Sequence, residues 1–184
     1  MAPWSAMRAY IAHPDPLVST GNLIAIVVAS NQPFYPLYLY LAVSPDIGVS
    51  FLTFLSTPFF VAVPAVARRH SLLGRALLPA TGIANTILSA KAFGAASGVE
   101  MFLAPCVTIA ALLFRRSERR LMFALVGLGL ATYLGLHGRY GAPLHLYTAA
   151  EYAQFFGLNA FSVLTLAAFV GIAFANAFGE AERG

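Results

Sequence analysis

Charge is what this sequence has least of. Only 10% of its 184 residues are Asp, Glu, Lys or Arg, whereas 59% are hydrophobic. Soluble domains carry about 25% charged residues, so a chain with so few cannot cover the surface of a water-soluble globule. The composition therefore excludes a soluble globular domain and indicates an integral membrane protein with the lipid bilayer as its first partner.

Cysteine and lysine are almost absent too, since Cys106 and Lys91 are the only ones. A single cysteine excludes an intramolecular disulfide and a metal cluster built from cysteines alone. The net charge of +4 does not predict a nucleic-acid partner, because basic residues beside membrane spans usually set topology. Arginine supplies nearly all of the positive charge, which is typical of a GC-rich bacterial genome and places the protein in the bacterial inner (plasma) membrane.

Hydrophobic runs fill most of the chain. Crossing roughly 30 Å of hydrocarbon takes about 20 helical residues, which leaves room for about six spans with short connections. We therefore predict an all-α fold, a polytopic bundle of six transmembrane helices forming one domain over residues 1–184. The expected spans cover about 20–43, 48–67, 75–93, 97–114, 120–137 and 150–178.

Prolines divide the first two spans. Pro33 and Pro36 should kink the first, and Pro58 and Pro64 the second, because each proline removes a helix donor. In the third span we expect Pro79 to fall in the first turn, where a proline is tolerated.

The positive charges lie on one side of the expected topology. The terminal tails and the second and fourth connections carry Arg8, Arg68, Arg69, Arg75, Arg115, Arg116, Arg119, Arg120 and Arg183. The opposite side has only Lys91 and Arg139. The positive-inside rule then predicts that both termini are cytoplasmic.

The segment 90–105, "AKAFGAASGVEMFLAP", sets a serine before a glycine as an intramembrane protease does. Rhomboid-type proteases need Gly-x-Ser-Gly, but Ala95 occupies the first glycine position before Ser97. A serine is also a poor nucleophile without an adjacent base, and the last span contains no histidine. We therefore predict no catalytic residue and no enzyme.

The same segment is better explained as a turn between the third and fourth spans. Gly94 and Gly98 supply backbone freedom, and Ser97 is placed to cap the fourth span. Lys91 and Glu100 flank the turn, and we expect these two side chains to pair across it.

Polar residues within the spans allow two interpretations. Thr81, Asn85 and Ser89 form one stripe on the third span, and Glu151, Asn159 and Ser162 form another on the last. Such groups commonly hydrogen-bond between helices. The alternative is a cavity for a small-molecule ligand or solute. The span residues that would line it are Asn31, Asn85 and Asn159.

The connection before the last span adds His137 and His145, with Glu151 starting the span itself. A carboxylate with two histidines can hold zinc, but the spacing of these residues is not diagnostic. We predict no metal and no cofactor, and we keep these three residues as candidate ligand contacts. Asp, Glu, Lys and Arg are missing from the middle of every expected span, which disfavours ion pumping and proton coupling.

Three segments carry a family resemblance: "FGAASGVEMFLAP", "ALLFRRSERR" and "LNAFSVLTLAAFVGIAFANAF". Over residues 85–178 the sequence resembles the six-helix membrane domains that precede class III adenylate and guanylate cyclases in bacteria. The resemblance implies a receptor-like domain whose last helix continues towards a cytoplasmic catalytic part. Here only "AFGEAERG" follows Asn176, so we expect a membrane domain without the catalytic part.

Two functions follow as hypotheses. The first is a non-enzymatic, sensor- or receptor-like membrane module that acts through a signalling partner or as a homo-oligomer. The second is a small-solute transporter with a polar path lined by the third and sixth spans.

Overall fold

The computed structural model describes residues 3–181, and within this range the regular structure is entirely helical. The predicted all-α class is confirmed. The α-helices are α1 Pro3–Ile11, α2 Pro16–Asn31, α3 Tyr35–Ala42, α4 Thr57–Arg69, α5 Ser71–Phe93, α6 Leu103–Leu112, α7 Arg119–Leu136 and α8 Ala149–Ala181. The 3-10 helices are η1 Gln32–Phe34, η2 Gly48–Ser56, η3 Ala95–Ser97, η4 Val99–Phe102 and η5 Arg116–Glu118.

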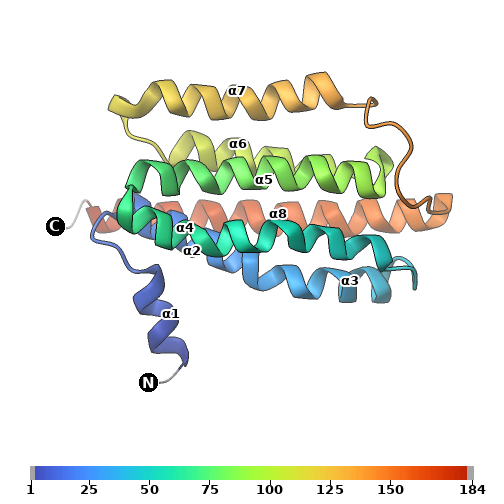
Figure 1. The fold of residues 1–184 in the computed structure, drawn as a ribbon, viewed down its shortest axis with the longest axis horizontal. Helices are drawn as coiled ribbons and strands as arrows, with labels where there is room; N and C mark the ends of the chain where they lie inside the picture. The colour runs from blue at the N-terminus through green and yellow to red at the C-terminus, as the bar shows by residue number, and fades with distance from the viewer. Residues whose placement is uncertain (1–2, 182–184) are drawn as a thin grey trace.

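The helices α2 to α8 run side by side along one long axis, and α1 projects away from them (Figure 1). The start of α2 and the end of α8 lie at the same end of the bundle as the turns 69–71 and 113–118, which carry Arg69, Arg115 and Arg116, and we call this the basic end. The turn 94–98 and the connection 137–148 lie at the opposite end, which we call the loop end. Helix α5 lies at the centre and contacts α2, α4, α6 and α7.

Three helical segments in the described range are long and apolar enough to cross a membrane: 48–69, 116–136 and 149–179. Six were expected. The segment 99–112 is apolar but shorter, and the first expected span is divided into α2 and α3. Helix α5 is long enough, but it carries Arg75, Lys91 and several polar residues.

The apolar exterior of the bundle fits a lipid environment. Large hydrophobic side chains point outward from α7 and α8, including Phe123, Leu134, Phe161, Leu164 and Ile172, each more than half exposed. Water-soluble proteins rarely leave such a contiguous apolar surface uncovered.

Prolines divide the first expected span as predicted, whereas the second continues through Pro64 without a break. Helix α2 starts at Pro16, earlier than expected, because the Asp15 side chain accepts the Leu17 amide as an N-cap. It ends at Asn31, and the 3-10 turn containing Pro33 separates it from α3. In the second span, Pro58 lies in the first turn of α4 and Pro64 lies inside that helix.

The third span differs from its prediction in two ways. Helix α5 begins at Ser71, so Pro79 lies well inside it and not in its first turn. Arg75 was expected in a connection, but it lies within α5 and is only 3% exposed. Helices α4 and α5 approach each other closely at Gly74, where an added Cβ would lie 2.5 Å from Ala67 Cα.

Candidate functional site

The turn between α5 and α6 has the conformation expected from its glycines. Gly94 and Gly98 have φ values of 86° and 75°, a region that residues with a side chain rarely adopt. Ser97 Oγ donates to Gly94 O at 2.6 Å and accepts from Val99 N at 3.3 Å. The serine of the protease-like segment is therefore a turn residue whose hydroxyl holds the local backbone.

Glu100 follows this turn and is the most deeply buried carboxylate at the loop end, with 6% exposure. Its Oε2 lies 2.7 Å from Nδ1 of His137, which ends α7. The other oxygen, Oε1, is buried without a hydrogen-bond partner among the described residues. Buried polar atoms are usually satisfied, and the Tyr140 hydroxyl is the donor that interacts with this carboxylate besides His137.

Tyr140 lies beside Glu100 from the connection 137–148. Its hydroxyl is buried and interacts with the Glu100 carboxylate. Burial first, and then the charge of Glu100 and hydrogen bonding to it, raise the pKa of Tyr140 to about 12. Glu100, His137 and Tyr140 therefore form a polar cluster, which we call the Glu100 cluster, beneath an exposed connection.

The expected pairing of Lys91 with Glu100 is wrong. Lys91 Nζ donates to the carbonyls of Tyr140 at 3.2 Å and Ala142 at 2.7 Å. The ammonium group of Lys91 binds backbone carbonyls of the connection 137–148. The carboxylate of Glu100 contacts His137 instead. The Leu144 amide also donates to the carbonyls of Lys91 and Ala92, so the end of α5 holds the connection in place.

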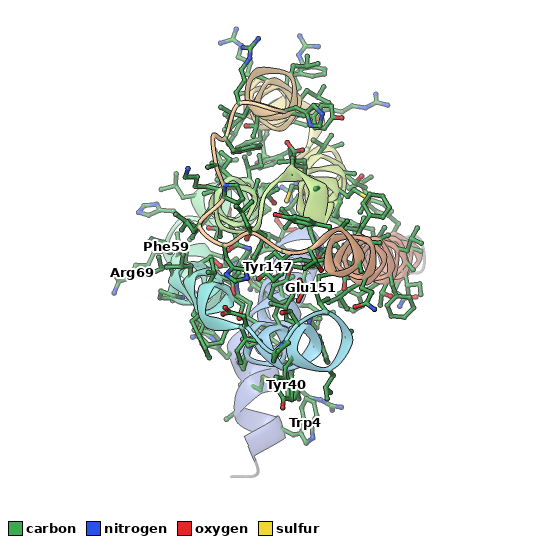
Figure 2. The ribbon with its side chains drawn as sticks, turned by 90° about the vertical axis from the view of Figure 1, so that its right-hand side faces the viewer. Trp4, Tyr40, Phe59, Arg69, Tyr147 and Glu151 are labelled. Atoms are coloured by element: carbon green, nitrogen blue, oxygen red, sulfur yellow. The ribbon has the colours of Figure 1, made fainter. Side chains whose placement is uncertain are left out.

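His145 and Glu151, the other two candidates from this region, lie apart from the Glu100 cluster in their contacts. His145 Nδ1 is 3.5 Å from Asp46 Oδ2, and its ring packs edge-on against Tyr147. Glu151 accepts hydrogen bonds from the amide and hydroxyl of Thr148, both at 2.8 Å, which closes the first turn of α8. Figure 2 views this end of the bundle, with Tyr147 and Glu151 near its centre.

The three asparagines predicted to line one cavity occupy different surroundings. Asn159 is fully buried; it accepts from Tyr35 Oη at 3.1 Å and donates to Ser97 O at 2.9 Å. Asn31 is exposed and lies 3.5 Å from Tyr38 Oη. Asn159 therefore joins α3, α8 and the turn 94–98, which is the helix-to-helix role that was the first interpretation of these polar residues.

Asn85 lines a groove that contains neither Asn31 nor Asn159. This groove runs between η2, α4 and α5 and has a volume of about 380 Å³. Its lining residues are Leu55, Ser56, Phe59, Ala80, Thr81, Ala84, Asn85 and Leu88.

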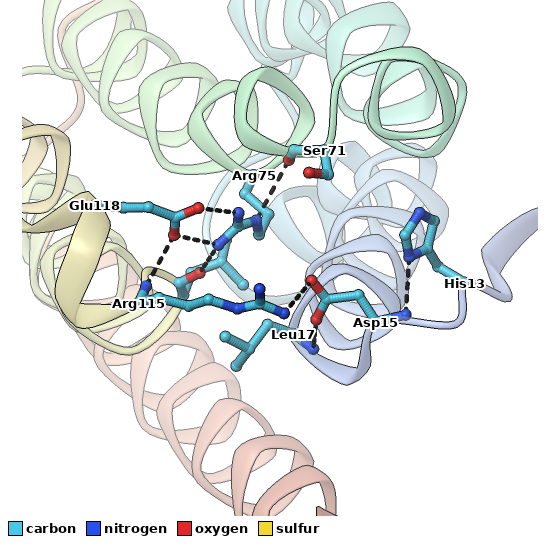
Figure 3. A network of polar contacts seen from close by, with 8 residues as sticks. His13, Asp15, Leu17, Ser71, Arg75, Arg115 and Glu118 are labelled. Carbon is cyan, nitrogen blue, oxygen red and sulfur yellow. Dashed lines mark hydrogen bonds and ion pairs between the residues drawn. The ribbon is translucent and has the colours of Figure 1, made fainter.

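A charged network at the basic end was not predicted (Figure 3). Buried Arg75 makes a bidentate pair with Glu118, with distances of 2.6 and 2.7 Å, and also donates to Leu113 O at 2.9 Å. Arg115 bonds Asp15 at 2.8 Å, and the Arg115 amide donates to Glu118. The available signal was the lone acidic residue in "RRSERR", which needs a cation from elsewhere in the chain.

Replacing Asn159 by leucine should destabilise the fold by about 1–3 kcal/mol, because Tyr35 Oη and Ser97 O would lose their buried partner. Denaturing-detergent titrations followed by circular dichroism would measure the loss. Asn176→Leu, at an exposed position of the same helix, is the matched control and should change stability little. Equal stability of both variants would contradict a linking role for Asn159.

The Glu100 cluster also predicts a pH effect. The neutral phenol of Tyr140 is favoured by the fold, so its contribution to stability is complete below pH 10 and is lost as pH rises through about 12. A difference titration of phenolate absorbance between the wild type and Tyr140→Phe should show this group ionising near pH 12. Glu100→Gln should lower the midpoint only in part, since burial is the larger cause. A Tyr140 midpoint near 10 in the wild type would contradict the buried arrangement.

No protein-family model, curated protein or solved structure matches this chain. Within residues 3–181, no group of three or more His, Cys, Asp or Glu side chains is arranged to hold a metal ion. Among the described residues, the Glu100 cluster and the groove at Asn85 each contain buried polar atoms that a ligand could satisfy, and Asn22 and Tyr147 contain one such atom each.

Proposed function

We propose that this protein is a non-enzymatic, sensor- or receptor-like module of the bacterial inner membrane. In this proposal six helical segments cross the bilayer, both termini are cytoplasmic, and the basic end faces the cytoplasm. The excess of arginine at that end supports the orientation. The loop end, with the Glu100 cluster, would then face the periplasm.

The observation that carries the proposal is the buried carboxylate of Glu100, which interacts with His137 and Tyr140 at the loop end. It lies within reach of the exposed end of the bundle, next to His137, which is more than half exposed. A small ligand that donates a hydrogen bond or carries positive charge would satisfy Oε1, and the low local dielectric would strengthen that contact. His145 and Glu151 remain proposed as secondary contacts around the same end.

A route from this end to the opposite one runs through α8. Asn159 on α8 holds Ser97 O, and the turn containing Ser97 leads directly into Glu100. At the other end of α8, Val170 and Phe174 are buried in the main core with residues of α2, α4, α5 and α6. Movement of the turn would therefore be transmitted to packing near the basic end by a helix of 33 residues.

The output would be a partner protein or a second copy of this chain. The resemblance of residues 85–178 to the membrane domains of class III cyclases suggests a nucleotide cyclase or a comparable signalling enzyme as the partner. A gene for such an enzyme beside the gene of this protein would support this part of the proposal.

A distance measurement tests the coupling. Spin labels would be placed at the basic end on Asn176→Cys and Leu72→Cys, in a Cys106→Ala background. Glu100→Gln, which weakens the pair with His137, should shift the distance distribution between these labels. Gln154→Ala, at an exposed position of α8 near the loop end, is the matched control and should leave the distance distribution unchanged. An unchanged distribution in Glu100→Gln would contradict transmission through α8.

The alternative, small-solute transport, is distinguished by a separate assay. A path lined by α5 and α8 would need their polar side chains to face a channel, but Asn159 and Ser162 are engaged in hydrogen bonds with protein carbonyls. Solute uptake into proteoliposomes that is abolished by Asn85→Ala or Asn159→Ala would favour transport over sensing.

A further inference from the structure

We propose that the groove at Asn85 binds a membrane-dissolved lipid whose polar group is an uncharged hydroxyl. The inference rests on the groove and on the proposed crossing of the bilayer by α5, and it does not depend on the sensing role proposed for the Glu100 cluster. Three properties of the groove define the ligand: its apolar lining, the unsatisfied amide of Asn85, and the position of Asn85 along α5.

The lining is suited to a hydrocarbon chain. Leu55, Phe59 and Leu88 form its apolar walls. Ala80 and Ala84, which have small side chains, form its floor on α5. Leu55 and Phe59 are 60% and 55% exposed, so the groove opens sideways from the bundle and towards lipid. Its volume of about 380 Å³ lies within the range of small-molecule sites, roughly 300–1,000 Å³.

The polar requirement comes from Asn85. Among the described residues, its Oδ1 is buried and has no hydrogen-bond partner. An amide carries both donors and an acceptor, so either orientation of the group leaves both functions to be satisfied. A hydroxyl both donates and accepts, and it can therefore satisfy either atom. Thr81 lies one turn away on the same wall and offers a second hydroxyl.

The position of Asn85 along α5 excludes a charged headgroup. Asn85 lies 14 residues after Ser71 and 8 before Phe93, so about 21 and 12 Å from the two helix ends. Both distances place it inside a hydrocarbon core of about 30 Å when α5 crosses the bilayer. Phosphate or ammonium at this depth would be strongly unfavourable, whereas a neutral hydroxyl paired with an amide is tolerated.

Photolabelling of the full chain in nanodiscs tests the proposal. The probes are a long-chain alcohol bearing a diazirine and the corresponding hydrocarbon without the hydroxyl. The alcohol should label peptides containing residues 55–59 and 80–88. Asn85→Leu should reduce this labelling about tenfold, as expected for loss of one buried hydrogen bond worth about 1.4 kcal/mol. Asn176→Leu is the control and should label as the wild type does.

A second variant separates loss of the amide from loss of the fold. Ala84→Phe narrows the groove but keeps Asn85, and it should reduce labelling by both probes while the helical content measured by circular dichroism stays constant. The hydrocarbon probe should not distinguish Asn85→Leu from the wild type. Labelling by the alcohol that is equal in Asn85→Leu, or that is spread over the outer faces of α7 and α8, would overturn the proposal.

Discussion

Arg75→Leu is expected to lower the free energy of unfolding by about 3 kcal/mol, because removing one member of a buried ion pair leaves the other uncompensated. Arg75 is 3% exposed and Glu118 is 20% exposed, so water screens this pair only partly. The substitution also removes the donor to Leu113 O, near the end of α6. Titration with a denaturing detergent, followed by circular dichroism, would measure the loss.

Three further variants sharpen this prediction. Arg69→Leu removes an exposed arginine of α4, labelled in Figure 2, and should change stability by no more than about 0.5 kcal/mol. Arg75→Lys keeps the charge but not the bidentate geometry, and should fall between the wild type and Arg75→Leu. Arg75→Leu combined with Glu118→Leu should recover part of the loss, because no unpaired charge remains. A double variant no more stable than Arg75→Leu alone would contradict this account of the pair.

Gly74→Ala is expected to destabilise the protein by about 1–3 kcal/mol, although it adds a single methyl group to a helix. An added Cβ would lie 2.5 Å from Ala67 Cα and 2.6 Å from Ala67 N. These are backbone atoms, so no side chain can rotate to make room, and α4 and α5 would have to separate. Small residues commonly allow such close approach of helices in membrane proteins.

Gly127 and Gly171 provide the matched controls for Gly74. Both are within helices, and an added Cβ would meet no atom within 4 Å at either position. Alanine at these sites should therefore be neutral or stabilising by up to about 1 kcal/mol, because it is the better helix former. The same unfolding titration measures all three variants. Equal effects at Gly74 and Gly127 would show that helix propensity, and not the contact with Ala67, decides the outcome.

The helices could be predicted to within a few residues because hydrophobic runs and prolines are local signals. Pro33 separates α2 from α3 as its missing amide requires, and α7 and α8 match the expected fifth and sixth spans closely. The position of Arg75 was not predictable in this way. Its partner Glu118 is 43 residues away, so nothing near Arg75 distinguishes it from the loop arginines that precede it.

The candidate site shows the same division. Glu100 and His137 were both evident as polar residues near span ends, but their contact joins positions 37 residues apart. Lys91 was assigned to the nearest carboxylate in sequence, whereas the fold brings two loop carbonyls closer to it. Asn85 and Asn159 were selected by the same rule of helical spacing. Only the packing decides that Asn159 is satisfied by two partners and that Asn85 is left with none.

Labelling of single cysteines in intact cells tests the transmembrane arrangement most directly, since every proposed role of the two ends depends on it. In a Cys106→Ala background, the positions would be Arg139→Cys and Leu144→Cys at the loop end, and His70→Cys and Arg116→Cys at the basic end, all of them exposed. A membrane-impermeant maleimide should label the first pair in intact cells and the second pair only after permeabilisation. Labelling of His70→Cys or Arg116→Cys in intact cells, or protection of both loop-end cysteines, would contradict a bundle that crosses the membrane with its basic end in the cytoplasm.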